Sequence, residues 1–136
     1  MGVERLKDLE ALFNESIKDA ILQAEVFNEV DVVIGIPFYN EKDILPEVLK
    51  VLDEGLASLQ DLRNALIVSV GDPIGVETLA AIRRLDLKTP HLEFLMRPGS
   101  NGRGASIRAI LEIANVLEAD AVLFTADLVR EEGRGL

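Results

Sequence analysis

The sequence predicts an α/β fold, a three-layer Rossmann-like sandwich with a mainly parallel sheet, preceded by an amphipathic helix. Short β-branched runs alternate with longer segments whose apolar residues recur every three or four positions. The short runs are almost continuously apolar, as expected of strands buried on both faces of a parallel sheet. This alternation requires right-handed crossovers between parallel strands, which is why an α/β class is favoured over an antiparallel one.

Composition limits the classes of function. The chain has 136 residues, the size of one domain, and 49% of them are hydrophobic, which argues against disorder. It contains no cysteine, so disulfides, thiolate zinc sites and cysteine nucleophiles are excluded. The formal charge of −10 argues against nucleic acid as a partner. No apolar run is long enough for a transmembrane segment or resembles a signal peptide, so we expect a cytoplasmic protein.

The elements follow in order along the chain. We expect an amphipathic helix over residues 1–30 and then a buried strand over 31–37. Asn40 is the predicted N-cap of the next helix. The remaining predicted ranges are helices at 41–59, 76–85 and 105–117, strands at 65–70, 91–96 and 121–125, and a polar tail at 129–136.

Polar residues follow the first two strands, at the edge of a parallel sheet where ligands collect. Asn40 and Glu41 follow the first strand; they either cap a helix or bind a ribose or base. Asp72 follows the second strand, either as a turn residue beside Pro73 or as an acceptor for a base or sugar hydroxyl. The residues alone leave both alternatives open.

The third loop is the one basic segment of an acidic chain. Residues 97–108 contain three arginines and no acid, and the run Asn101-Gly-Arg-Gly104 opens a helix. Glycines, a helix start and local positive charge together favour a diphosphate site over solvated arginines. The spacing matches neither a P-loop nor a dinucleotide fingerprint.

After the fourth strand, Asp127 is a candidate ligand for Mg²⁺ or Mn²⁺, although a single aspartate there is also typical of a turn or cap. His91, the only histidine, begins a strand at the opposite edge of the sheet, and we interpret it as structural.

Four loops in this order resemble the family-2 glycosyltransferases of the GT-A fold, over residues 31–128. The matching segments are Val33-Ile-Gly-Ile-Pro-Phe-Tyr-Asn-Glu41, Asp72, Asn101-Gly-Arg-Gly-Ala105 and Ala121-Val-Leu-Phe-Thr-Ala-Asp-Leu128. The resemblance implies a protein that transfers a sugar from a nucleoside-diphosphate sugar to an acceptor hydroxyl. It also implies that nucleotide-sugar-binding residues are Pro37, Tyr39, Asn40, Glu41, Asp72, Asn101, Gly102, Arg103 and Gly104, with Asp127 on a divalent cation.

Two departures from the family pattern matter. Thr125 stands where the first aspartate of the Asp-x-Asp metal motif belongs. Family members continue for about a hundred residues, and that second half supplies acceptor contacts and, in inverting members, the catalytic base. We therefore expect a truncated, donor-binding half that is inactive alone, with its catalytic residues elsewhere.

The alternative hypothesis is a non-catalytic nucleotide-binding or assembly module with a degenerate metal motif. In that case the helix at 1–30 could form a homo-oligomer, although covering its own sheet is the simpler interpretation. A sugar-phosphate nucleotidyltransferase is disfavoured, because the loop after the first strand is not rich in glycine.

Overall fold

A computed structural model describes residues 2–58, 64–100 and 102–125. Four helices and four strands follow one another in this part of the chain, and the predicted α/β class is confirmed. Their bounds are α1 (Gly2–Ala24), β1 (Val32–Phe38), α2 (Leu45–Ser58), β2 (Ala65–Gly71), α3 (Val76–Arg83), β3 (His91–Leu95), α4 (Arg103–Val116) and β4 (Ala121–Phe124). None of these helices is long and apolar enough to cross a membrane.

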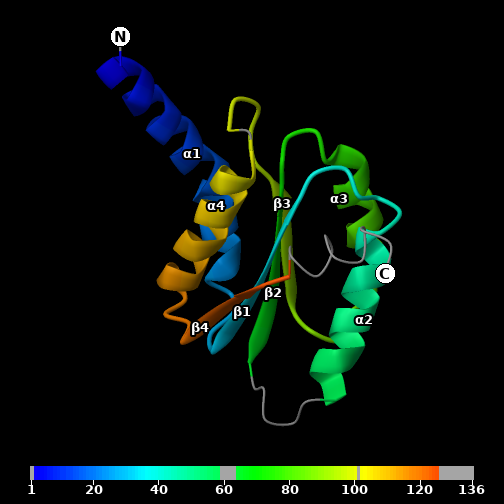
Figure 1. The fold of residues 1–136 in the computed structure, drawn as a ribbon. Helices are drawn as coiled ribbons and strands as arrows, with labels where there is room; N and C mark the ends of the chain where they lie inside the picture. The colour runs from blue at the N-terminus through cyan, green and yellow to red at the C-terminus, as the bar shows by residue number, and fades with distance from the viewer. Residues whose placement is uncertain (1, 59–63, 101, 126–136) are drawn as a thin grey trace.

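The strands form one parallel sheet in the order β3-β2-β1-β4. The chain adds strands outward from β1 to β3 and then crosses back to place β4 on the other side of β1. Because right-handed crossovers that run in opposite directions lie on opposite faces, α2 and α3 cover one face while α4 covers the other. Figure 1 shows this arrangement, with α1 beside α4.

The core has two parts, one on each face of the sheet. Residues of α1 and α4 pack with Val33, Val68 and Val70 on one face, while α2 and α3 pack with Ile34, Ile36 and Ile67 on the other. Central strands β1 and β2 are therefore buried on both faces. This explains their nearly continuous apolar sequence, and each strand begins and ends within one residue of its predicted range.

Helix boundaries differ more from the prediction. The first helix ends at Ala24, and Phe27 continues to pack against the core from outside the helix. Because Phe27 is apolar, the regular spacing of apolar residues continues beyond the last residue of the helix, and the predicted helix was too long. The second helix begins at Leu45, so the prediction that Asn40 is its N-cap is wrong. A turn intervenes instead, in which the carbonyl of Glu41 accepts hydrogen bonds from the N–H groups of Ile44 and Leu45.

Only the second half of the apolar stripe on α1 is covered. Phe13 and Ile17 are 5% and 4% exposed, whereas Leu6 and Leu9 on the same stripe are 66% and 47% exposed. The N-terminal turns of α1 extend beyond the sheet in Figure 1. The helix therefore covers its own sheet, as the simpler interpretation expects. That its exposed N-terminal turns form a homo-oligomer contact stays a prediction.

Candidate functional site

The carboxyl ends of the strands and the loops that follow them, here called the carboxyl edge, hold most of the predicted site residues. Pro37 lies inside β1, opposite Val70 of β2, and is buried. Tyr39 and Asn40 follow the end of that strand, and Asn40 is exposed. The Tyr39 N–H donates a hydrogen bond to Oε2 of Glu41 at 2.7 Å. The Glu41 carboxylate thus holds its own loop.

Asp72 connects two loops of the carboxyl edge. Its side chain is 5% exposed, and one carboxylate oxygen accepts the Ile74 N–H at 3.2 Å. The other oxygen accepts the Gly102 N–H at 2.9 Å. Asp72 is therefore a turn residue, which is one of the two alternatives that the sequence left open. Its contact with Gly102 was not predicted. This contact fixes the start of α4 against the end of β2.

The N-terminus of α4 is an exposed set of backbone donors. Gly102 is the N-cap of the helix and has φ of +99°, a conformation that favours glycine, and it has no side chain with which to cap the helix. The Asp72 carboxylate accepts the Gly102 N–H, and no other side chain among the described residues accepts an N–H group of the first turn. The helix dipole favours negative charge at this end, and Asp72 supplies part of it. Gly104 is exposed and borders a cavity of about 270 Å³ between α1 and α4. Asn101 and the Arg103 side chain lie outside the described part of the structure.

The predicted basic segment is largely paired with α1. Arg108 Nη1 lies 2.9 Å from Glu10 Oε2, and the guanidinium group stacks 3.9 Å from the centre of the Phe13 ring. Arg97 lies 3.9 Å from a carboxylate oxygen of Glu15. Hydrogen bonding to Arg108 lowers the pKa of Glu10. Two of the three arginines therefore lie beside carboxylates of the N-terminal helix, which reduces their positive potential at the carboxyl edge.

The described residues do not form a divalent-cation site. No group of three His, Asp or Glu side chains that could hold a metal ion occurs among residues 2–58, 64–100 and 102–125. Glu41 and Asp72 already accept backbone N–H groups. Thr125 is described at the end of β4, and the predicted ligand Asp127 lies outside the described residues, as does the tail at 129–136. The donor set that hard cations prefer is therefore not present in this part of the chain.

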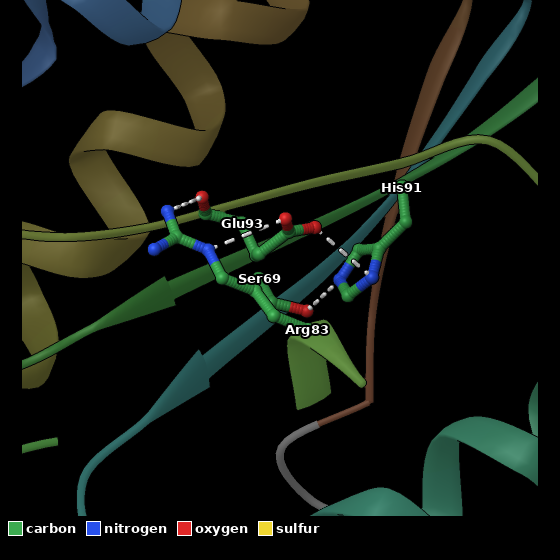
Figure 2. Close-up of polar contacts among 4 residues, drawn as sticks. All are labelled: Ser69, Arg83, His91 and Glu93. Carbon is green, nitrogen blue, oxygen red and sulfur yellow. Dashed lines mark hydrogen bonds and ion pairs between the residues drawn. The ribbon is translucent and has the colours of Figure 1, made fainter. Parts of the chain in front are cut away.

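A polar cluster on the face covered by α3 was not foreseen. Figure 2 shows His91 between Ser69 and Glu93: the Ser69 hydroxyl is 2.8 Å from Nε2 and a Glu93 oxygen is 3.2 Å from Nδ1. Arg83 lies 3.6 Å from Glu93 on the outer side. The order of groups is that of a serine–histidine–acid triad, but Ser69 is 0% exposed and no substrate can reach it. The interpretation of His91 as structural agrees with this geometry.

Burial governs the ionisation of this cluster. It lowers the pKa of His91 to about 4, with Asp53 of α2 acting weakly in the opposite direction. Burial also raises the pKa of Glu93 despite the nearby Arg83. Asp53 accepts the N–H groups of Lys88 and Thr89 at 2.9 and 2.7 Å, and thereby anchors the loop before β3. The sequence signal for this contact is an aspartate on the apolar stripe of α2, four residues after Leu49.

The comparisons with known proteins add no relative. No family model, no curated protein and no solved structure matches this chain.

Proposed function

We propose that this chain is the donor-binding part of a cytoplasmic, glycosyltransferase-like protein that transfers a sugar from a nucleoside-diphosphate sugar to an acceptor hydroxyl. The hydrogen bond between Gly102 and Asp72 carries the proposal, because it brings two loops of the resemblance together at the start of α4. Segments thirty residues apart thus meet where a parallel sheet binds its ligands.

The chemistry required of this part of the protein is electrostatic. Glycosyl transfer breaks the bond between the anomeric carbon and the diphosphate, so negative charge develops on the leaving nucleoside diphosphate. The backbone N–H groups that follow Gly102 at the start of α4 are suited to stabilise that charge, because the fold fixes them and the N-cap glycine has no side chain that would compete for them. The resemblance adds Arg103 to this role. The acceptor loses its proton to a base that we do not assign to this chain.

Ligand binding tests the proposal directly. Calorimetric titrations with UDP, GDP and their sugars, each with and without Mn²⁺, should give binding, and the same ligands should raise the melting temperature. If no nucleotide binds or stabilises the protein at millimolar concentration, the donor-site proposal is wrong.

Gly104 offers a matched pair of variants for the same test. A Cβ atom at Gly104, which both Gly104→Ala and Gly104→Pro add, would have no neighbouring heavy atom within 4 Å. Only proline removes a backbone N–H, and the first turn of a helix tolerates it. We expect the proline variant to weaken nucleotide binding and the alanine variant to retain it. Equal affinities would show that the start of α4 does not bind the phosphates.

The second candidate is a module that binds the nucleotide without transferring the sugar. The geometry of Asp72 favours it, because both carboxylate oxygens accept backbone hydrogen bonds and the group is not free to act as a base. Release of nucleoside diphosphate from a bound donor when an acceptor is added, followed by phosphorus NMR, would overturn this second candidate.

A further inference from the structure

The strand β4 is an exposed edge of the sheet. It lies beside β1 at one end of the strand order, and no other strand in the part of the chain that the structure describes pairs with its outer side. Figure 1 shows β4 at the side of the sheet, next to β1. Leu123 and Phe124 are 52% and 39% exposed, although both are apolar. An apolar edge strand of this kind is a surface to which another strand can be added.

The outward backbone groups of β4 follow from its pairing with β1. The Ala121 N–H donates to the Asp31 carbonyl, just before β1, and the Thr125 N–H donates to a carbonyl of β1 itself, both at 3.2 Å. Backbone groups of successive residues point to opposite sides of a strand, so those of Val122 and Phe124 point away from β1. Each of these two residues therefore presents one donor and one acceptor at the outer edge of the sheet.

The opposite edge of the sheet is protected by charge. At β3, the Arg83 side chain donates to the backbone carbonyl of Glu93 at 3.5 Å, and its Nε lies 3.6 Å from the Glu93 carboxylate. Charged side chains along an edge strand hinder the addition of a further strand. Residues 121–124 of β4 contain no charged side chain and no proline. The two edges therefore differ, and β4 is the one suited to strand addition.

A second copy of β4 fits this edge in the antiparallel orientation. When Leu123 lies opposite Leu123 of the second copy, Val122 lies opposite Phe124, and these two residues can exchange backbone hydrogen bonds. Directly opposite side chains lie on the same face of a sheet, so the exposed leucines meet at a two-fold axis. The chain has a formal charge of −10, but no carboxylate faces another in this register, because residues 121–124 are uncharged. The edge of β4 is therefore complementary to itself.

We propose that two copies of this chain associate through β4, in antiparallel pairing centred on Leu123, and thereby join their two four-stranded sheets into one. The contact is small, so we expect a weak dimer with a dissociation constant on the order of 0.1 mM. This inference does not depend on the proposed function, because it uses no residue of the nucleotide site.

Amide hydrogen exchange at two protein concentrations tests the contact in the unchanged protein. With that dissociation constant, about 80% of the chains are paired at about 1 mM, so the Val122 and Phe124 amides should exchange about fourfold more slowly than at about 0.01 mM. The Leu123 amide points toward β1 and should be slow at both concentrations, which makes it the internal control. Protection of Val122 and Phe124 at both concentrations would show that the same chain covers the edge. Protection at neither would show that the edge stays open, and either result overturns the inference.

A charge exchange at Leu123 tests the register. Leu123→Glu and Leu123→Lys each place like charges opposite one another, so sedimentation should show association at least about tenfold weaker than that of the unchanged protein. An equal mixture of the two variants should associate about tenfold more tightly than either variant alone, because opposite charges then meet. If the mixture associates no better than its components, the inference is wrong.

A third variant controls for the added charge. Leu22 is 58% exposed on α1, which packs against β3 at the other side of the sheet. Leu22→Glu should therefore associate as the unchanged protein does, and a loss of association equal to that of Leu123→Glu would overturn the inference. Because Leu123 is 52% exposed, both of its variants should keep the fold. If they unfold, the exchange measurement still decides the question, since it needs no variant.

Discussion

At the scale of single residues, His91 links the fold to pH. Its imidazole side chain is 9% exposed, and burial lowers its pKa from 6.5 to about 4. The unfolded chain therefore takes up a proton at a higher pH than the folded protein does. Stability is retained above pH 6.5 and falls as the pH drops from 6.5 to about 4, by about 3 kcal/mol in all.

Denaturant unfolding at several pH values measures this loss. His91→Gln keeps hydrogen-bonding capacity toward Ser69 and Glu93 without titrating, so its stability should depend less on pH between 6.5 and 4. Glu93 acts in the opposite direction, because burial raises its pKa and its stabilising effect is lost as the pH rises through that value. Both proteins contain Glu93, so the difference between their pH slopes measures His91 together with its contact to Glu93. Identical pH slopes would contradict the assignment.

At the scale of elements, α1 divides into a packed half and a bare half. Ile17→Ala removes a side chain that is 4% exposed and should cost about 2–5 kcal/mol of unfolding free energy. Leu6→Ala lies on the same stripe, but the side chain is 66% exposed, so the change should stay within about 0.5 kcal/mol. Chemical denaturation measures both. A large, concentration-dependent cost at Leu6 would instead support the homo-oligomer through α1.

The contact between α4 and the sheet depends on a glycine. A Cβ atom at Gly35 would lie 2.7 Å from Ile110 of α4 and 3.1 Å from the Phe124 ring. Gly35→Ala should therefore destabilise the protein by about 1–3 kcal/mol through overpacking. Gly55 in α2 is the matched control, with no heavy atom within 4 Å, and Gly55→Ala should stabilise by about 0.5–1 kcal/mol. Thermal unfolding of both variants shows whether their shifts have opposite signs.

The same elements show which boundaries a sequence can predict. The ends of β1 and β2 were predictable because both faces of these strands are buried, which leaves an uninterrupted apolar run. The start of α2 was not predictable in this way. Glu41 forms a turn through its carbonyl and carboxylate, and the spacing of apolar residues carries no sign of that turn. Phe27 caused the predicted first helix to end too late, because a side chain can pack on the core from outside a helix.

At the scale of the whole molecule, the sequence predicted where the candidate site residues lie in the fold better than which contacts they make. Parallel topology alone places Glu41 and Asp72 at one edge of the sheet. The engagement of Asp72 with Gly102, and of Arg108 with Glu10, depends on how loops and helices meet in three dimensions. Spacing along the chain carries no information about such pairs. The sequence therefore predicted a basic segment, although two of its three arginines lie beside acidic side chains of α1.

Net charge gives the last prediction. The chain has a formal charge of −10, and the folded state brings these like charges closer together than the unfolded chain does. Its exposed ion pairs, such as Lys42 with Glu77, contribute little. Raising NaCl from about 0.01 to 0.1 M shortens the screening length from about 30 to 10 Å, so self-repulsion should weaken and the melting temperature should rise.

A charge-reduced variant shows whether repulsion causes that rise. Glu25, Glu29 and Glu54 are exposed, so replacing all three by glutamine removes negative charge without disturbing the core. The variant should melt higher than the unchanged protein at low salt and should respond less to added NaCl, because less repulsion remains to be screened. Calorimetry at constant pH measures both effects. If salt lowers the melting temperature of the unchanged protein, ion pairs such as Arg108 with Glu10 contribute more to stability than the net charge costs.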